Sequence, residues 1–382
     1  MIFTAKKVQQ KLKTFLPALV ISLALTSCET SSTTKTQVEI TYQFHSTVTY
    51  LPEGTNGTAG TTATYCYFGD WPQTIKENNV AVYENQSITM GGARYYAGSD
   101  GNWYAKCKEN AYKADFTYSD GTIAALADSK STKYFKVEAI KWRVLNPTAE
   151  NENKLLLAEY ALVADIPYYD YNEVNRTIND KTIYPNNYEH SKIRAYLNGI
   201  SYIKKDSDSS EQTTNCEYLN KGFLHTAFTN IAQDLIAATD LDNSAASTNP
   251  ASNPTQWNDG ENQYICNTTK DKIFLLSEKE VTTSEFGFDE YNVYIDDSYG
   301  TTESNRTRKA TDYTIANHCW QDDDEYNWGL ETYNTLWWLR SPRADLCDYV
   351  AHDVIYSGEA HCSCNVNDGT CSIVPALSIS AN

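Results

Sequence analysis

The sequence predicts a mixed α+β domain with short strands, few helices and long loops. Short runs of β-forming residues are separated by turn signals, and only two segments carry helical periodicity. Stretches rich in Ser, Asn, Asp and Thr connect these segments. The 382 residues suffice for one large domain or two ordinary ones. An apolar content of 41% and a charged content of 21% are typical of a globular chain.

The N-terminus has the pattern of an export signal. Four lysines precede the apolar run 15–25, which is too short for a permanent membrane span. The sequence Leu25-Thr26-Ser27-Cys28 resembles the lipobox of bacterial lipoproteins. This resemblance implies a signal peptide over residues 1–27 and a lipid on Cys28; the alternative is an ordinary signal peptide with an incidental Cys28. We expect this lipid to be the only membrane anchor and to place the protein in the cell envelope, at the outer membrane or cell surface.

Residues 28–64 are expected to form a lipidated tether and an N-terminal strand. Residues 29–37 are small and polar, as in a flexible linker, whereas residues 38–50 loosely alternate in polarity and predict a strand. The main domain is expected over residues 65–382. Its first half contains two Asp-Gly turn signals, at Asp100-Gly101 and Asp120-Gly121, which predict hairpins. In residues 134–145 the apolar phase shifts by one residue after Ala139, which predicts a β-bulge.

The second half of the domain supplies the helices. Residues 154–162 predict a buried strand, and residues 188–199 predict a helix that ends at Gly199. A second helix is expected around residues 218–229, followed by a strand over residues 271–281. Residues 206–215 and 240–262 are expected to be loops.

Charge and cysteine content limit the partners of the chain. A net charge of −18 opposes binding to phosphate backbones, so no nucleic acid partner is expected. Without Cys28 nine cysteines remain, and their spacing matches no zinc motif, so no metal site or cofactor is predicted. The acidic run Asp322-Asp323-Asp324-Glu325 either attracts calcium or forms a solvated loop.

Several motifs share an order with a known family. They are FGDWPQT at residues 68–74, KWRVL at 141–145, IRAYLN at 193–198, DKIFLLS at 271–277, WWLRSP at 337–342 and VPAL at 374–377. This series resembles a bacterial lipoprotein family known as a domain of unknown function (six-two-seven-three), common in treponemes and their relatives. The chain departs from the family's usual G-V-V-P-A or G-V-R-P-A ending, because Ser372-Ile373-Val374 stands where the glycine is usual.

The chain is also similar to treponemal variable-protein lipoproteins. That similarity implies a C-type-lectin-like fold of the formylglycine-generating-enzyme type, with a C-terminal region diversified by a retroelement. Codons diversified in this way cannot encode Lys, Gln, Glu, Met or Trp. Residues 343–372 contain one residue of these five types, Glu359, although the five types fill about one position in six of the whole chain. An undiversified loop rich in small residues is the alternative explanation.

Region 343–372 is therefore the candidate variable ligand-binding region. We expect its candidate side chains to be mostly exposed and clustered on one face: Asp345, Tyr349, His352, Asp353, Tyr356, His361, Asn365, Asn367 and Asp368. Scaffold roles are expected for Trp71, Trp337, Trp338, Arg340, Pro342, Gly358 and Pro375. The tryptophan pair is expected in the core, with a sugar-stacking platform as the alternative. Arg340 is expected to pair with a carboxylate, with anion binding as the alternative.

The sequence leads to a non-enzymatic, surface-displayed protein that binds an unidentified protein or glycan. Tyr, Asn, Ser, His and Asp are common on evolved binding surfaces. His352 and His361 lie near several Asp and Cys residues, a set that in other proteins supplies a nucleophile and base or binds a metal. No specific spacing supports catalysis here. The remaining alternatives are a static envelope lipoprotein and an enzyme related to formylglycine-generating proteins.

Overall fold

The computed structural model describes eight stretches of the chain: residues 38–57, 63–148, 152–249, 264–288, 305–321, 334–343, 349–360 and 362–380. All of them belong to one compact unit that begins at Val38. This unit has a mixed, strand-rich fold with few helices, as the sequence predicts. Among the described residues, no helix combines the length and apolar character that crossing a membrane requires. The predicted signal peptide, Cys28 and the acidic run 322–325 lie outside the described residues.

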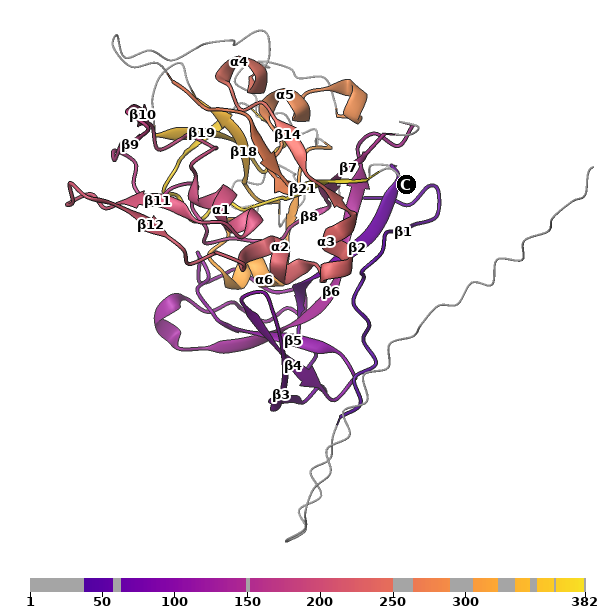
Figure 1. The fold of residues 1–382 in the computed structure, drawn as a ribbon. Helices are drawn as coiled ribbons and strands as arrows, with labels where there is room; N and C mark the ends of the chain where they lie inside the picture. Colours follow the sequence, from indigo (N-terminus) through magenta and orange to yellow (C-terminus); the bar gives the residue numbers. More distant parts are fainter. Residues whose placement is uncertain are drawn as a thin grey trace, which may run out of the picture. The chain divides into compact units, whose positions relative to one another are not determined.

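A ten-stranded sheet forms the framework of the unit (Figure 1). Its main path has the order β13-β21-β7-β6-β5-β4-β3, while β2 pairs with β6 and β1, and β16 pairs with β21. Its pairs are antiparallel. The strands are β1 (Thr49–Tyr50), β2 (Tyr65–Ile75), β3 (Val82–Met90), β4 (Ala93–Gly98), β5 (Trp103–Lys108), β6 (Thr132–Val144), β7 (Lys154–Ala158), β13 (Ile236–Ala237), β16 (Ile273–Phe274) and β21 (Ala376–Ile379).

Smaller sheets surround this framework. A three-stranded sheet is formed by β18 (Trp337–Pro342), β19 (Val350–Val354) and β20 (Cys362–Asn365). In Figure 1 it lies at the opposite end of the unit from β3, β4 and β5. The two-stranded pairs are β9 (Arg176–Ile178) with β10 (Lys181–Ile183), β11 (Tyr202–Lys205) with β12 (Gln212–Asn215), β14 (Thr239–Leu241) with β15 (Thr269–Asp271), and the parallel pair β8 (Tyr160–Ala161) with β17 (Lys309–Ala310).

The helices of the described unit are short, with at most seven residues each. They are α1 (Lys192–Asn198), α2 (Gly222–Ala227), α3 (Asn230–Leu235), α4 (Ala245–Thr248), α5 (Glu278–Val281) and α6 (Asp312–Ala316), with 3-10 turns η1 (Ala127–Ser129) and η2 (Ser284–Phe286). Helix α2 packs against both α1 and β2. The predicted helix at residues 188–199 is confirmed in the shorter form of α1, which begins after the N-cap Ser191 and ends at Gly199 with φ +64°. The helix expected around residues 218–229 is confirmed as α2, and Leu219 lies outside it and is exposed.

The phase shift in the sequence of β6 is confirmed, but the extra residue lies in its partner strand. Phe135 and Val137 are buried on one side of the shift, and Ile140 and Trp142 on the other. The register passes from Tyr67↔Lys141 to Asp70↔Ala139, so β2 has one residue more than β6 in this interval. Gly69 lies in this interval with φ +71°, and a Cβ there would lie 2.4 Å from Cε1 of Phe228. Glycine at this position therefore permits both the bulge and the close approach of Phe228, the C-cap residue of α2.

Two predicted strands are corrected by the structure. Of residues 38–50, only Thr49–Tyr50 pair as a strand, while the amides of Thr41 and Tyr42 donate to the carbonyl of Gly101 at 3.1 Å. The strand expected over residues 271–281 ends at Phe274. Ser277 and Glu280 then form a reciprocal capping box that starts α5, because each side chain satisfies a free backbone amide of the other.

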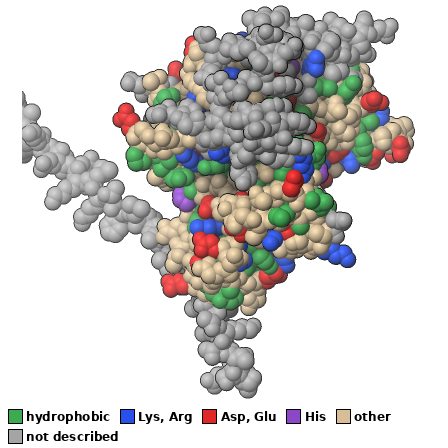
Figure 2. Space-filling model, turned by 180° about the vertical axis from the view of Figure 1, so that it is seen from behind, with side chains coloured by type: hydrophobic (Ala, Val, Ile, Leu, Met, Phe, Trp, Pro, Cys, Tyr) green, Lys and Arg blue, Asp and Glu red, His purple; other side chains and the backbone are tan. Residues whose placement is uncertain are grey.

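Strand β18 lies in the largest hydrophobic cluster of the unit, together with side chains of β6, β7 and β21. Every residue of this strand is buried. The visible face in Figure 2 shows acidic, basic and apolar side chains interspersed among other polar groups. The described surface on this face therefore has no single dominant charged patch.

Candidate functional site

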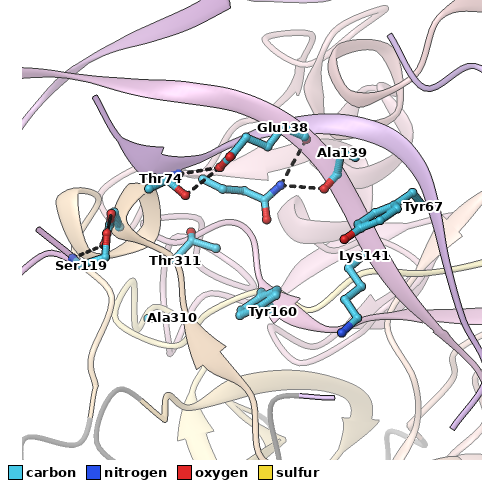
Figure 3. Close-up of a pocket in the computed structure, with 11 residues that line it drawn as sticks. Tyr67, Thr74, Ser119, Glu138, Ala139, Lys141, Tyr160, Ala310 and Thr311 are labelled. Carbon is cyan, nitrogen blue, oxygen red and sulfur yellow. Dashed lines mark hydrogen bonds between the residues drawn. The ribbon is translucent and has the colours of Figure 1, made fainter. Parts of the chain in front are cut away.

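A pocket of about 530 Å³ opens where β2 and β6 meet the segment that leads into α6. Its side chains come from five parts of the chain, namely the two strands, β8, residues 310–312 and Ser119 (Figure 3). Tyr67 and Lys141 lie at one end of the view, and Thr74 and Ser119 at the other. The pocket thus joins the N-terminal strands to elements found much later in the sequence.

The pocket's polar groups are held by one another. Glu138 accepts hydrogen bonds from the amide of Thr74 at 3.2 Å and from its hydroxyl at 2.7 Å. Gln73 donates from Nε2 to the carbonyls of Glu138 and Ala139, both at 3.1 Å. These bonds fix the orientation of one carboxylate and one amide before a ligand arrives, which lowers the entropy lost on binding.

The remaining walls are also tied in place. Asp312 accepts from the amides of Ile75 and Ser119 at 2.8 Å and from the Ser119 hydroxyl at 2.5 Å. Lys141 donates to the carbonyl of Asn56 at 2.9 Å and lies 4.4 Å from the ring centre of Tyr65. The described residues of the pocket lining include neither His nor Cys. Within that described lining, the Ser119 hydroxyl has a carboxylate partner but no imidazole to act as a general base.

The side chains predicted to form the variable surface differ in exposure. Asn365 and Asn367 are exposed, whereas Tyr349, Tyr356 and Asp368 are half-buried. Asp345 and His361 lie outside the described residues.

The expected exposure is wrong for His352 and Asp353, which are each 1% exposed. Both belong to β19, which is the middle strand of its sheet and has β18 on one side and β20 on the other. His352 Nε2 lies 3.6 Å from Oε2 of the fully buried Glu278. Both side chains can be buried because each has a polar neighbour from another part of the chain, Glu278 for His352 and Cys364 for Asp353.

The Asp353 carboxylate lies beside two thiols. Cys364 Sγ is 3.5 Å from Oδ2 of Asp353, and Cys371 belongs to the same compact group. Burial raises the pKa of Asp353 to about 7, and burial also raises the pKa of the Cys371 thiol. The described cysteine side chains are free thiols: Cys66, Cys107, Cys216, Cys266, Cys319, Cys364 and Cys371.

The predicted scaffold side chains lie in the interior. Trp337 and Trp338 are 0% exposed, and Trp71 donates from Nε1 to the carbonyl of Leu162 at 2.7 Å. Arg340 forms a two-bond pair with Glu280, with Nη2 to Oε1 at 2.9 Å.

The other scaffold positions shape the backbone around β18. Pro342, Gly358 and Pro375 are buried, and Gly358 has φ +86°. The carbonyl of Gly358 accepts from Nε of Arg306 at 2.6 Å, and that of Pro375 accepts from the amide of Ala158 at 3.0 Å.

Sequence reasoning missed the pocket and a second polar group at β2. Asp70 is 2% exposed and accepts from the Tyr42 hydroxyl, from the amide of His45 at 2.8 Å and from Nδ1 of His45 at 2.7 Å. This hydrogen bond to Asp70 raises the pKa of His45. The charged residue inside the apolar motif FGDWPQT was the available signal, since a buried carboxylate needs donors.

Comparison with known proteins identifies one family. Residues 151–381 match the family described as "Domain of unknown function (DUF6273)". A search of the curated proteins and a search of the solved structures each gave no match. The matched region contains α1, β18, β19 and β21, whereas most of the pocket lining precedes it.

Proposed function

The chain belongs to the DUF6273 family, and from this premise we propose that it is a non-enzymatic binding protein of the cell envelope. The pocket beside β2 and β6 is its binding site, and the ligand is a polar molecule with several hydroxyl groups, such as a glycan. The observation that carries the proposal is the convergence of fixed polar groups from five parts of the chain on one open pocket.

The lining matches the chemistry of a sugar ring. Tyr67 and Tyr160 offer aromatic faces for C–H groups, together with hydroxyls that donate or accept. Glu138 and Gln73 supply a carboxylate and an amide, and Thr311 supplies a further hydroxyl. Pockets with a few oriented polar groups of this kind select ligands by hydrogen-bond geometry.

A glycan array tests this proposal directly. Purified protein is applied to immobilised oligosaccharides, and the strongest binder is then titrated in solution by calorimetry. Glu138→Gln is expected to weaken binding about tenfold, or about 1.4 kcal/mol, the scale of one hydrogen bond to a charged group. The matched control is Glu211→Gln, the same chemical change at an exposed position outside the pocket lining. Absence of binding across the array, or equal binding by the Glu138→Gln variant, contradicts the proposal.

We propose further that Cys28 carries the lipid that anchors the protein, and that the fold is C-type-lectin-like, of the formylglycine-generating-enzyme type. The lysines, apolar run and lipobox-like ending support the anchor, and the strand-rich unit with few helices supports the fold class. Cys28→Ser is expected to move the protein from the membrane fraction to the soluble fraction. If this variant is processed and retained like the wild type, Cys28 is not the anchor.

A second candidate function is display of a diversified surface. Two observations favour it. Asn365 and Asn367 are exposed, and among residues 343–372 only Glu359 is of a type that retroelement diversification excludes. Sequencing of sibling genes is expected to show variation at Tyr349, Tyr356, Asn365, Asn367 and Asp368. The codons of Trp337 to Pro342 serve as the internal control, since these side chains are buried. Equal variation in both segments contradicts diversification.

A further inference from the structure

We propose that Asp353, Cys364 and Cys371 form a zinc-binding site. One carboxylate oxygen and two Sγ atoms lie within 4.8 Å of one another in this group. Asp353 and Cys371 are buried, and Cys364 is half-buried. This site is separate from the proposed pocket, so neither proposal depends on the other.

Strand pairing brings the ligands together. Asp353 belongs to β19 and Cys364 to β20, where Cys364 is the register partner of Ala351. Directly paired residues and residues two apart along a strand share a face, so Asp353 and Cys364 lie on the same face of the sheet. Their closest ligand atoms are 3.5 Å apart. Two ligands on a tetrahedral zinc ion, bonded at about 2.0–2.3 Å, are separated by a similar distance, roughly 3.5 Å.

A second observation, independent of the spacing, also indicates a cation. Oδ1 of Asp353 is buried and has no hydrogen-bond partner among the described residues. Among the described residues, the charged groups that act on Asp353 include Asp368 and Glu359, which are both acidic. A buried carboxylate oxygen without a partner is unfavourable, and so is repulsion between neighbouring acidic groups. A bound divalent cation would give the oxygen a partner and offset the repulsion.

The donor set selects the metal. Zinc accepts thiolate and carboxylate ligands in four-coordinate sites, with water in a position that the protein leaves open. Calcium and magnesium require oxygen ligands in larger number, and here two of the three donors are sulfur. On binding, each thiol loses its proton to solvent and forms one S–Zn bond, so the two thiols release two protons, and the carboxyl group of Asp353 releases any proton that it carries.

A disulfide between Cys364 and Cys371 is the competing state. It fits the buried carboxylate less well, because oxidation removes the thiol donor that Cys364 directs to Asp353. Zinc instead gives the carboxylate a direct bond. The metal would join the two ends of residues 365–370, which include the exposed Asn365 and Asn367. We therefore expect zinc to order the base of this loop.

The first experiment measures metal binding by the full chain, reduced and stripped with a chelator. After incubation of this protein with zinc, one equivalent is expected to remain bound after gel filtration, as measured by mass spectrometry of the metal. Replacement by cobalt is expected to give a thiolate-to-cobalt charge-transfer band. Cys364→Ser, Cys371→Ser and Asp353→Asn should each lower zinc affinity at least about 100-fold, since loss of even an indirect partner costs 10- to 100-fold. Cys266→Ser, which removes a buried thiol outside the group, is the matched control.

The second experiment needs no variant and so does not depend on correct folding of the mutants. Alkylation of Cys364 is followed by peptide mapping with and without zinc, and zinc is expected to slow it at least tenfold. The exposed Cys216 is the internal control and should react at the same rate in both samples.

The proposal is overturned if the folded, reduced wild type retains no zinc, or if zinc leaves the alkylation of Cys364 unchanged. Equal retention by the three ligand variants also overturns it. So does a Cys364–Cys371 disulfide in protein isolated without exposure to oxidants. Loss of zinc from the ligand variants alone, with protection of Cys364 in the wild type, supports it.

Discussion

Strands β2 and β18 each contain a tryptophan motif and each bury one charged side chain, yet the partners of the two charges differ in kind. In β18, Arg340 is 4% exposed, pairs with Glu280 and donates to the carbonyl of Leu275 at 2.9 Å. In β2, Asp70 is 2% exposed and accepts from Tyr42 and His45. Arg340 therefore has a carboxylate partner, whereas Asp70 has one neutral partner and one imidazole, whose pKa the hydrogen bond to Asp70 raises.

This difference separates two kinds of attachment. Glu280 belongs to the capping box of α5, so the pair with Arg340 ties a helix to a fully buried strand. Tyr42 and His45 belong to the segment that precedes β1, so Asp70 ties the start of the folded unit to the sheet. We expect the first attachment to be strong and independent of pH above the carboxylate range, and the second to be weaker and dependent on pH.

The largest effect is expected from the core of β18. Trp338→Ala should lower the free energy of unfolding by about 3–5 kcal/mol, because it removes a fully buried ring and leaves a cavity. Urea denaturation followed by circular dichroism measures this change.

The matched control is Trp103→Ala, in a half-buried position on β5, which should lower stability by less than Trp338→Ala. A loss below about 1 kcal/mol for Trp338→Ala would contradict a core role for this side chain and favour a ligand platform instead.

The next effect concerns the pair in the same strand. Glu280→Gln should destabilise the unit by about 3 kcal/mol, since it leaves the Arg340 guanidinium buried without its counter-charge. The double variant Arg340→Met with Glu280→Met should lose less, because it removes the unpaired charge as well. Urea denaturation of the wild type, Glu280→Gln, Arg340→Met, Glu280→Met and the double variant gives the comparison. A double variant that is as unstable as the sum of the two Met single variants would show that the two side chains do not interact.

The smallest effect is expected at β2 and depends on pH. Asp70 raises the folded-state pKa of His45, so the protonated form is favoured in the folded protein. The resulting stability is fully present below the unfolded value of about 6.5 and is lost as the pH rises through the folded value. The free energy of unfolding of the wild type should exceed that of His45→Gln by at most about 1 kcal/mol, and the difference should be largest at about pH 6. Melting temperatures measured across the pH range test this prediction.

His225→Gln supplies a control of opposite sign. Burial lowers the pKa of His225, so the folded protein takes up a proton at this position less readily than the unfolded chain. The His225 side chain therefore destabilises the folded state as the pH falls below about 6.5. As the pH falls, the stability of the wild type should therefore decrease relative to that of His225→Gln and increase relative to that of His45→Gln. Parallel pH profiles for the two variants would contradict the assignment of His45 to Asp70.

The same contrast shows which features are predictable from sequence. The β4–β5 hairpin follows from Asp100-Gly101, and the end of α1 follows from Gly199, because these signals act over a few residues. The capping box at Ser277 and Glu280 was equally local, yet the apolar run before it led to the prediction of a longer strand. A local signal at the end of an apolar run deserved more weight than the run itself.

Long-range features did not follow from the sequence. His352 and Asp353 were assigned to the surface by residue type, but their burial depends on Glu278 and Cys364, which other elements bring to β19. The extra residue at Gly69 was placed in the wrong strand, because a register shift looks the same from either partner. The pocket needs residues from positions 67 to 312 at once, and no local pattern indicates such a combination.

The position of β21 has a consequence for how the protein is made. This four-residue strand, which ends one residue before the last described residue, pairs with β7 on one side and with β13 and β16 on the other. The main sheet is therefore incomplete until residues 376–379 have been synthesised. A chain that lacks β21 has one unpaired sheet edge at β7 and another at β13 and β16, and such edges are open to wrong partners. We expect that truncation before Ala376 yields an aggregating product rather than a shortened, folded one.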